Sequence, residues 1–389
     1  MPAEPFRIDV PQAVLDDLRA RLAMTRWIEE AEDGWARGAD LRYLKALAAH
    51  WQGRFDWRAQ EAAINGLAQF RAVVDGLRIH FIHVRGVGPR PLPLVLTHGF
   101  PDSFVRFLKI VPLLTDPAAS GGDPEDAFDV VVPSLPGYAF SDAPPKGGAT
   151  FRIGDVWHAL MTKTLGYPRF AAHGGDWGST VTEQIARSHP RSVVGIHLTD
   201  VPFWHVFRKP DDPSAAERAF LEANEAWQLR EGPYALLQGS RPLSLAPALL
   251  DSPIGLAAWI VEKFARWSDC GGDLETRFSK DEILTNLTLY WATGTIGSSF
   301  RPYEDFTTGG AVRWLIEGVK QWLGGTVPAA FALFPKDISQ PPREWAERFF
   351  DVRRWTPMPR GGHFAAMEEP ALLAEDIRAF FRPLRVAAA

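Results

Sequence analysis

Asp176 stands at the centre of the stretch with the clearest capacity for chemistry. Glycines lie two positions before and two positions after it, at Gly174 and Gly178. This spacing is typical of a nucleophile elbow, a sharp turn from strand to helix that exposes its central side chain. A carboxylate at the centre suits displacement at a saturated carbon, and it leaves an ester that water can cleave. Taken alone, the stretch could equally be a glycine turn with a capping aspartate.

Two further residues could complete a catalytic triad with Asp176. A carboxylate nucleophile needs a base that activates water and an acid that orients the base. In an elbow fold the chain order is nucleophile, acid, histidine. Asp337 follows an apolar run that ends at Phe334, and His363 lies before the last expected helix. Each residue alone would be ordinary, but together and in this order they indicate a triad.

Ester hydrolysis also requires hydrogen-bond donors for the charge that develops on the carboxyl oxygen. In this architecture the donors are backbone N–H groups of the residue after the nucleophile and of the loop after the third strand. The candidates are Trp177 and Phe100, the second of which lies in the tetrad His98-Gly99-Phe100-Pro101. The tetrad alone would also fit a loop with a turn proline.

Apolar runs locate the strands that must position these residues. Residues 73–81 alternate around Asp75-Gly76 and predict a hairpin. Further buried strands are expected at 94–96, 128–133, 170–172, 193–198, 327–334 and 352–355. Short apolar strands that alternate with helices indicate a mostly parallel sheet covered on both faces, and therefore an α/β protein.

The periodicity divides the chain into four parts. Residues 1–70 are predicted to be a helical extension without a convincing strand, which wraps the core. Residues 71–202 form the first part of the α/β core and 326–389 the second part. Between them, 203–325 show helical periodicity and are predicted to be a helical lid domain. A final helix is expected from about Pro370 to Phe381.

The composition excludes several classes of partner. The net charge of -5 without a basic patch argues against nucleic acid. Cys270 is the only cysteine, which excludes an internal disulfide and favours a reducing compartment. No apolar run approaches the roughly 20 residues that span a bilayer, and the N-terminus is not a signal peptide. We therefore expect a cytoplasmic protein without membrane contact, and no metal or nucleotide motif is present.

The sequence resembles the epoxide hydrolases of the α/β-hydrolase fold, specifically their microsomal-like branch. The resemblance covers essentially the whole chain, and its motifs are moderate singly but highly specific together. They are His98-Gly99-Phe100-Pro101, Gly174-Gly175-Asp176-Trp177-Gly178, Tyr290-Trp291-Ala292-Thr293-Gly294-Thr295-Ile296, Phe334-Pro335-Lys336-Asp337 and Gly361-Gly362-His363-Phe364-Ala365-Ala366-Met367-Glu368. The missing N-terminal membrane anchor departs from the mammalian members and fits a soluble microbial enzyme.

The resemblance implies two lid tyrosines that hydrogen-bond the epoxide oxygen. The expected lid contains Tyr234, Tyr290 and Tyr303, and the residue pattern alone does not choose among them. The family's sequence contexts favour Tyr234 and Tyr303, which leaves Tyr290 as a packed residue. A phenol suits this task because its ordinary pKa of about 10 keeps it a donor at neutral pH.

The implied reaction converts an apolar epoxide and water to a vicinal diol through an ester on Asp176, without a cofactor. His363 must be neutral to act as the base, so activity is expected to fall as the pH drops through its pKa. The aromatic-rich lid favours an aryl or alicyclic substrate. Relatives often dimerise, so the resemblance is compatible with a homodimer but does not fix the oligomeric state. It also leaves open a role in antibiotic biosynthesis or in detoxification.

Three other functions compete with this interpretation. A haloalkane dehalogenase shares the Asp-Trp elbow, but it often has asparagine at the position of Phe100 and it does not need a tyrosine pair. A serine esterase is disfavoured because no serine occupies the centre of an elbow. A non-enzymatic binding protein would tolerate a broken triad, whereas all three members are present here.

Overall fold

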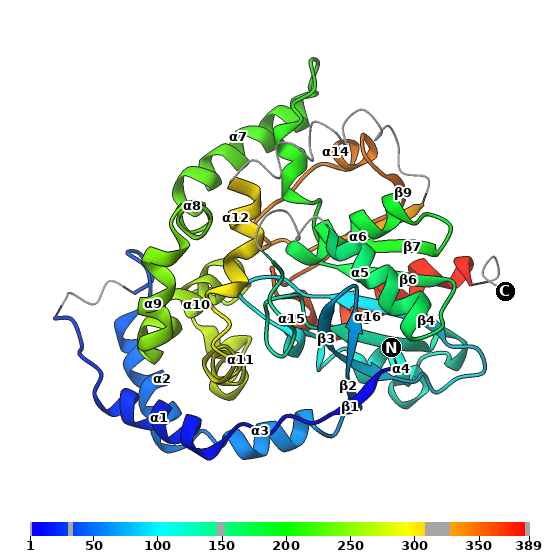
Figure 1. The fold of residues 1–389 in the computed structure, drawn as a ribbon. Helices are drawn as coiled ribbons and strands as arrows, with labels where there is room; N and C mark the ends of the chain where they lie inside the picture. The colour runs from blue at the N-terminus through cyan, green and yellow to red at the C-terminus, as the bar shows by residue number, and fades with distance from the viewer. Residues whose placement is uncertain (1, 30–33, 146–151, 308–326, 386–389) are drawn as a thin grey trace.

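The computed structural model describes residues 2–29, 34–145, 152–307 and 327–385, and a twisted sheet lies at its centre (Figure 1). Within those residues the sheet has nine strands in the order β1-β2-β3-β5-β4-β6-β7-β8-β9. The strands are β1 (Glu4–Phe6), β2 (Gln69–Val74), β3 (Leu77–Val84), β4 (Leu92–Thr97), β5 (Phe128–Pro133), β6 (Phe170–Gly174), β7 (Val193–Leu198), β8 (Pro328–Leu333) and β9 (Asp351–Pro357).

The prediction of a mostly parallel sheet is confirmed. Strands β4 to β9 pair in parallel, whereas β1, β2 and β3 pair antiparallel, as does β3 with β5. The expected hairpin is present, with Val74 opposite Leu77. Every residue of β5 and of β7 is buried, as a parallel sheet covered on both faces requires.

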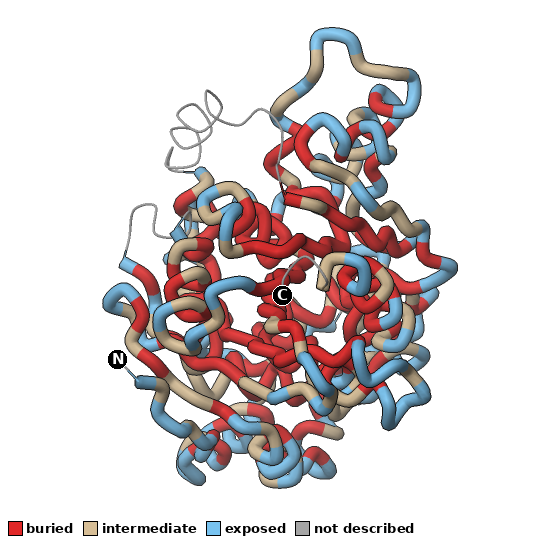
Figure 2. The backbone as a smooth tube through the Cα atoms, turned by 90° about the vertical axis from the view of Figure 1, so that its right-hand side faces the viewer, coloured by how far each residue is buried: buried red, intermediate tan, exposed pale blue. Residues whose placement is uncertain are grey.

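Helices cover both faces of the sheet. On one face α5 (Ile153–Ala159) packs on α6 (Trp177–Ser188), and α6 lies on β4, β6 and β7. On the other, α4 (Val111–Thr115) packs on β5 and on α16 (Pro370–Phe381), which lies on β7 and β8. The last helix has the predicted bounds. The buried residues form a continuous core through these layers (Figure 2).

The N-terminal segment contains the three helices α1 (Gln12–Ala23), α2 (Leu41–Gly53) and α3 (Trp57–Ile64). The prediction that this segment lacks a strand was wrong, because Glu4–Phe6 forms β1 and pairs with β2. A strand of three residues is too short for an alternating pattern, and its Pro5 is tolerated at the sheet edge. Helices α1 and α2 also pack on α10 (Pro253–Trp267) and α11 (Lys280–Thr293), which belong to the inserted helices. The segment therefore contacts the inserted helices as well as the sheet.

Helices follow β7 as an arc beyond the sheet (Figure 1). They are α7 (Ala215–Arg230), α8 (Pro233–Ser240), α9 (Pro242–Asp251), α10 (Pro253–Trp267), α11 (Lys280–Thr293) and α12 (Arg301–Thr307). Residues 308–325 of the predicted lid lie outside the described residues. In the described part of the chain no single helix is long and apolar enough to cross a membrane, while α9 and α10 meet that criterion only as a pair bent by 114°.

Short helices complete the fold around the sheet ends. The 3-10 turns are η1 (Phe104–Phe107), η2 (Pro117–Ser120), η3 (Pro124–Asp126), η6 (Phe203–Phe207), η7 (Leu274–Thr276), η8 (Ser298–Phe300) and η9 (Arg382–Leu384). The π-helical turn η5 (Leu160–Thr164) extends α5. Helices α14 (Arg343–Glu347) and α15 (Ala365–Glu368) flank β9, and α15 follows directly after His363 and Phe364.

Candidate active site

Asp176 occupies a sharp turn between β6 and α6. Its backbone has φ 60° and ψ −130°, a left-handed conformation that costs a non-glycine residue about 1–3 kcal/mol. A Cβ atom on Gly174 would lie 2.2 Å from the carbonyl oxygen of Gly178, and one on Gly178 would lie 2.0 Å from that of Thr97. Both flanking positions therefore require glycine, and the turn has the form expected of a nucleophile elbow.

The two carboxylate oxygens of Asp176 have different neighbours. The Phe100 N–H donates to Oδ1 over 2.8 Å, whereas Oδ2 lies 3.5 Å from Nε2 of His363. The loop of Phe100 approaches closely, since a Cβ atom on Gly99 would be 2.2 Å from Oδ1. Trp177, the other predicted oxyanion donor, is the first residue of α6, and the role of its N–H stays a prediction.

The structure brings Asp337 and His363 together beside Asp176. Nδ1 of His363 is 2.7 Å from Oδ1 of Asp337, and both side chains are 1% exposed. Asp337 follows β8, and its Oδ1 also accepts the N–H of Ile338 over 2.6 Å. The N–H of His363 donates to the Trp267 carbonyl over 2.8 Å, which anchors the histidine loop to the end of α10.

The charge of His363 depends on both carboxylates. Burial lowers the pKa of His363, but the charges of Asp337 and Asp176 outweigh burial and raise that pKa to about 10. With Asp176 ionised, His363 is therefore protonated at neutral pH. Conversion of Asp176 to an uncharged group would remove one of these charges and lower the pKa of His363, so that it becomes available as a base.

Asp102 and Arg106 form a buried ion pair that joins the two loops around the triad. Nη1 of Arg106 donates to Oδ2 of Asp102 over 2.6 Å, and Oδ1 of Asp102 accepts the N–H of Gly99 over 3.1 Å. Arg106 also donates to the carbonyl oxygen of His363. This pair was not predicted from the sequence, although its four-residue spacing directly after the His98 tetrad was a usable signal.

Tyr234 and Tyr303 lie over the elbow, from α8 and α12. The Tyr234 ring stacks on Phe100 with centroids 6.2 Å apart, and the Tyr303 ring meets Trp177 at 5.2 Å. The two tyrosine rings are 5.9 Å apart. Burial and the nearby Asp176 raise the pKa of both phenols, so both remain protonated donors.

Tyr290 has a different setting in α11. Its hydroxyl donates to the carbonyl oxygen of Asp102 over 3.0 Å, and its side chain is buried. Tyr290 is therefore a packed residue of α11, as the sequence predicts.

A cavity of about 160 Å³ connects Asp176 with the lid tyrosines. Much of its wall is aromatic, from Phe203, Trp227 and Phe306 as well as Trp177, Tyr234 and Tyr303. Polar groups enter from Asn224 and Gln228 of α7. The cavity therefore suits a compact apolar molecule with its reactive atom at Asp176.

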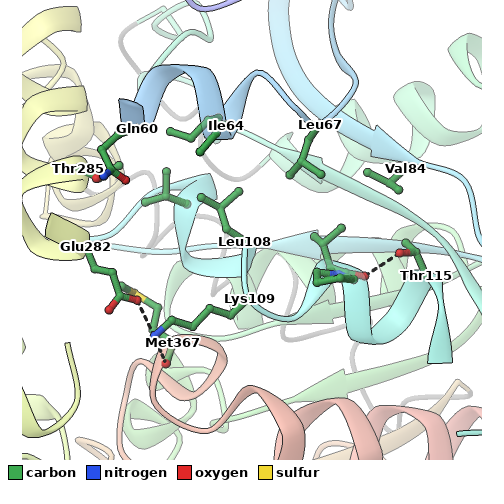
Figure 3. Close-up of a pocket in the computed structure, with 14 residues that line it drawn as sticks. Gln60, Ile64, Leu67, Val84, Leu108, Lys109, Thr115, Glu282, Thr285 and Met367 are labelled. Atoms are coloured by element: carbon green, nitrogen blue, oxygen red, sulfur yellow. Dashed lines mark hydrogen bonds and ion pairs between the residues drawn. The ribbon is translucent and has the colours of Figure 1, made fainter. Parts of the chain in front are cut away.

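A larger cavity of about 390 Å³ lies between α3, α4 and α11 (Figure 3). Its wall is mainly aliphatic, and its two charged side chains form an ion pair, since Nζ of Lys109 lies 2.5 Å from Oε1 of Glu282. The same Nζ also donates to the Met367 carbonyl over 3.1 Å. None of Asp176, Asp337 and His363 lines this cavity. Among the described residues, no group of three His, Cys, Asp or Glu side chains could hold a metal ion.

Comparison with known proteins identifies similar chains along the whole length. The family model "Epoxide hydrolase N terminus" matches residues 3–107, and "alpha/beta hydrolase fold" matches residues 93–244. A Stigmatella aurantiaca protein with a provisional epoxide hydrolase name is 44% identical, over 98% of this chain and 85% of its own. Epoxide hydrolase 1 of Sus scrofa is 37% identical, over 97% of this chain and 88% of its own. The crystal structure of juvenile hormone epoxide hydrolase from the silkworm Bombyx mori has a TM-score of 0.88 at 25% identity and covers 100% of this chain and 96% of its own.

Proposed function

Because this chain belongs to the epoxide hydrolase family of the α/β-hydrolase fold, we propose that it opens an epoxide through a covalent ester on Asp176 and releases a vicinal diol. The observation that carries the proposal is the environment of the Asp176 carboxylate. It faces His363 on one side and the Phe100 N–H on the other, at one end of a cavity lined by Tyr234 and Tyr303.

In the first step, Oδ2 of Asp176 attacks one epoxide carbon, and the bond from that carbon to the epoxide oxygen breaks. Tyr234 and Tyr303 donate hydrogen bonds to the departing oxygen, and one of the phenols transfers its proton to it, which makes it a hydroxyl group. The proton that His363 loses as Asp176 becomes an uncharged ester restores the phenol, so the step balances. Their raised pKa supports this role, since neither phenol loses its proton at neutral pH before the reaction. Asp176 lies at the N-terminus of α6, where the helix dipole attracts negative charge.

In the second step, Nε2 of His363 takes a proton from water, and the water oxygen attacks the carboxyl carbon of Asp176. The Phe100 and Trp177 N–H groups stabilise the oxyanion. The bond between the carboxyl carbon and Oδ2 then breaks, and the diol leaves with that oxygen and one proton of the water. The other proton stays on His363, and the Asp176 carboxylate is restored with the water oxygen in place of Oδ2. The ester carries no charge, so the pKa of His363 falls at the stage that requires a neutral base. The acid limit of activity therefore follows the pKa of His363 in the ester and not the value of about 10 in the free protein.

The substrate belongs to the apolar epoxides, aryl or alicyclic, because aromatic side chains surround the small cavity. We extend the proposal to a homodimer in the cytoplasm, and to a role in antibiotic biosynthesis or in detoxification. The haloalkane dehalogenase alternative is not favoured, because two protonated phenols suit a departing oxygen that needs a proton, whereas a halide leaves without one.

The test is intact mass spectrometry of His363→Gln after exposure to styrene oxide. We expect a mass increase of one substrate molecule, because alkylation proceeds while ester hydrolysis is blocked. The double variant that also carries Asp176→Asn is the control and should show no increase. The proposed role of Asp176 would be overturned if the wild type hydrolyses styrene oxide but His363→Gln shows no adduct. That result would point to direct attack by water on the epoxide.

A further inference from the structure

Asp200 is a buried carboxyl group at the elbow that the proposed mechanism does not use. It follows β7, and its side chain is directed at the backbone of the nucleophile. The Asp176 N–H donates to its Oδ1 over 2.9 Å, and Oγ1 of Thr199 lies 3.5 Å from the same oxygen. Its Oδ2 lies 2.9 Å from Oγ of Ser179 in the first turn of α6.

A count of hydrogens at Ser179 indicates the protonation state of Asp200. Oγ of Ser179 is 2.9 Å from Oδ2 of Asp200 and 2.7 Å from the carbonyl oxygen of Asp176. A hydroxyl has one hydrogen, and a carbonyl oxygen can only accept. If the hydroxyl hydrogen lies on the carbonyl side, a hydrogen between Oγ and Oδ2 must belong to Asp200. An ionised Asp200 would instead leave one of these short oxygen–oxygen contacts without a hydrogen.

The charges around Asp200 favour the same state. The charged groups that act on it are the carboxylates of Asp337 and Asp176 and the imidazole of His363, and Nη2 of Arg106 lies near the same side of Gly175 as its Oδ1. Arg106 already binds Asp102 and the His363 carbonyl. An ionised Asp200 would therefore place a third buried negative charge beside two carboxylates that share one imidazolium.

We propose that Asp200 is a positioning residue that acts as a neutral carboxylic acid. Its Oδ1 accepts the Asp176 N–H, its Oδ2–H donates to Ser179, and the Ser179 hydroxyl donates to the Asp176 carbonyl. This closed ring of hydrogen bonds holds both ends of the nucleophile's backbone in its strained conformation. The inference deepens the proposed function and rests on it only for the effect on catalysis, because the protonation state is a property of the free protein.

The pKa of Asp200 supports this assignment. Burial raises it most, the charge of Asp337 adds to the rise, and it reaches about 7. Below that pH the ring is intact. Above it Asp200 ionises, the ring loses the hydrogen between Oδ2 and Ser179, and a new charge lies beside Asp176.

The test is infrared spectroscopy of the full chain with ¹³C-labelled aspartate, followed from pH 6 to pH 8 without substrate. We expect the carbonyl band of a protonated carboxylic acid at pH 6, its decline as the pH rises through about 7, and its absence in Asp200→Asn. Ser179→Ala removes a partner of the acid and should shift the band, which keeps the assignment testable if Asp200→Asn does not fold. Asp126→Asn, at an aspartate paired with Arg382, is the control and should leave the band unchanged. Absence of the band at pH 6, or its persistence unchanged in both site variants, would overturn the proposal.

Activity provides a second readout. Asparagine preserves the ring, because its Oδ1 accepts from Asp176 and its Nδ2 donates to Ser179. In the wild type, kcat/KM should decline as Asp200 ionises above about pH 7. Asp200→Asn should therefore retain kcat/KM within about threefold at pH 6 and should not show this decline, whereas Asp200→Leu should lose about tenfold or more. An inactive but folded Asp200→Asn would show that the ionised carboxylate is needed. Ester accumulation on His363→Gln tests the covalent mechanism independently of Asp200. A failed mechanism would remove the ester adduct, whereas a failed assignment of Asp200 would remove the infrared band and leave the adduct.

Discussion

Asp176→Asn should lower the pKa of His363 by about three units. The substitution removes the charge that lies 3.5 Å from Nε2 of His363 and keeps the volume of the side chain. With an effective dielectric constant of about 20, Coulomb's law gives about 5 kcal/mol for two unit charges at this separation, which corresponds to about 3 to 4 pKa units. His363 would then titrate near 7 instead of about 10. The variant thereby imitates the uncharged ester and reports the basicity of His363 at the hydrolytic step.

Nuclear magnetic resonance titration of ¹³C-labelled histidine measures this shift directly. The chain has ten histidines, and comparison with His363→Gln identifies the resonance of interest. In the wild type, the His363 signal should stay in its protonated form up to about pH 10. In Asp176→Asn it should titrate about three units lower.

The pair of titrations can refute the reasoning in two ways. A shift of less than about one unit would mean that Asp176 does not control His363, so that esterification could not switch the histidine from acid to base. A wild-type pKa below neutrality would mean that the histidine is already neutral in the free protein. Asp337→Asn provides the matched control, since it removes the other carboxylate and should also lower the pKa of His363.

Four further outcomes follow from the geometry. Asp337→Asn should slow ester hydrolysis by about 10²-fold or more while alkylation continues, so mass spectrometry should detect the ester during turnover. Tyr234→Phe and Tyr303→Phe should each lower the single-turnover alkylation rate by about 10–100-fold, and the double variant should lower it further. Arg106→Met should destabilise folding by about 3–5 kcal/mol in a urea titration, because it leaves the buried Asp102 charge unpaired. Gly178→Ala should abolish folding or activity, since its Cβ would lie 2.0 Å from a carbonyl oxygen; an active variant with unchanged stability would contradict the steric argument.

Local requirements of the elbow were readable from the sequence. Gly174 is fixed by a collision with Gly178, four residues further along, whereas Gly178 is fixed by a collision with the Thr97 carbonyl of β4. The spacing of the two glycines about Asp176 nevertheless marks the turn in the sequence. Asp337 and His363 could be predicted because parallel strands deliver their carboxyl ends to one edge of the sheet in chain order. The tyrosines could not be chosen on physical grounds, because the contact of Tyr290 with Asp102 depends on how helices pack.

The supporting residues of the site could not be predicted, because they reach their partners through space. Arg106 and the His363 carbonyl are separated by 257 positions, and Asp200 and the Asp176 N–H by 24. In the sequence, each is an ordinary charged residue near the end of a strand or turn. The same limit applies to strand order, because the position of β5 between β3 and β4 follows from a chain crossover and not from apolar periodicity.

The two oxygens of Asp176 divide the proposed chemistry between them. Oδ2 faces His363 without a backbone donor among its described contacts and is the oxygen free to attack, while Oδ1 is already held by the Phe100 N–H. In the ester Oδ1 is the carbonyl oxygen, and in the tetrahedral intermediate it carries the negative charge. The donor that fixes the resting nucleophile is therefore in place for the oxyanion, and no donor has to be reoriented between the two steps. The same requirement explains the glycine at position 99. A side chain at Gly99 would collide with Oδ1 of Asp176 and push the Phe100 N–H away from the oxygen that it binds in both steps.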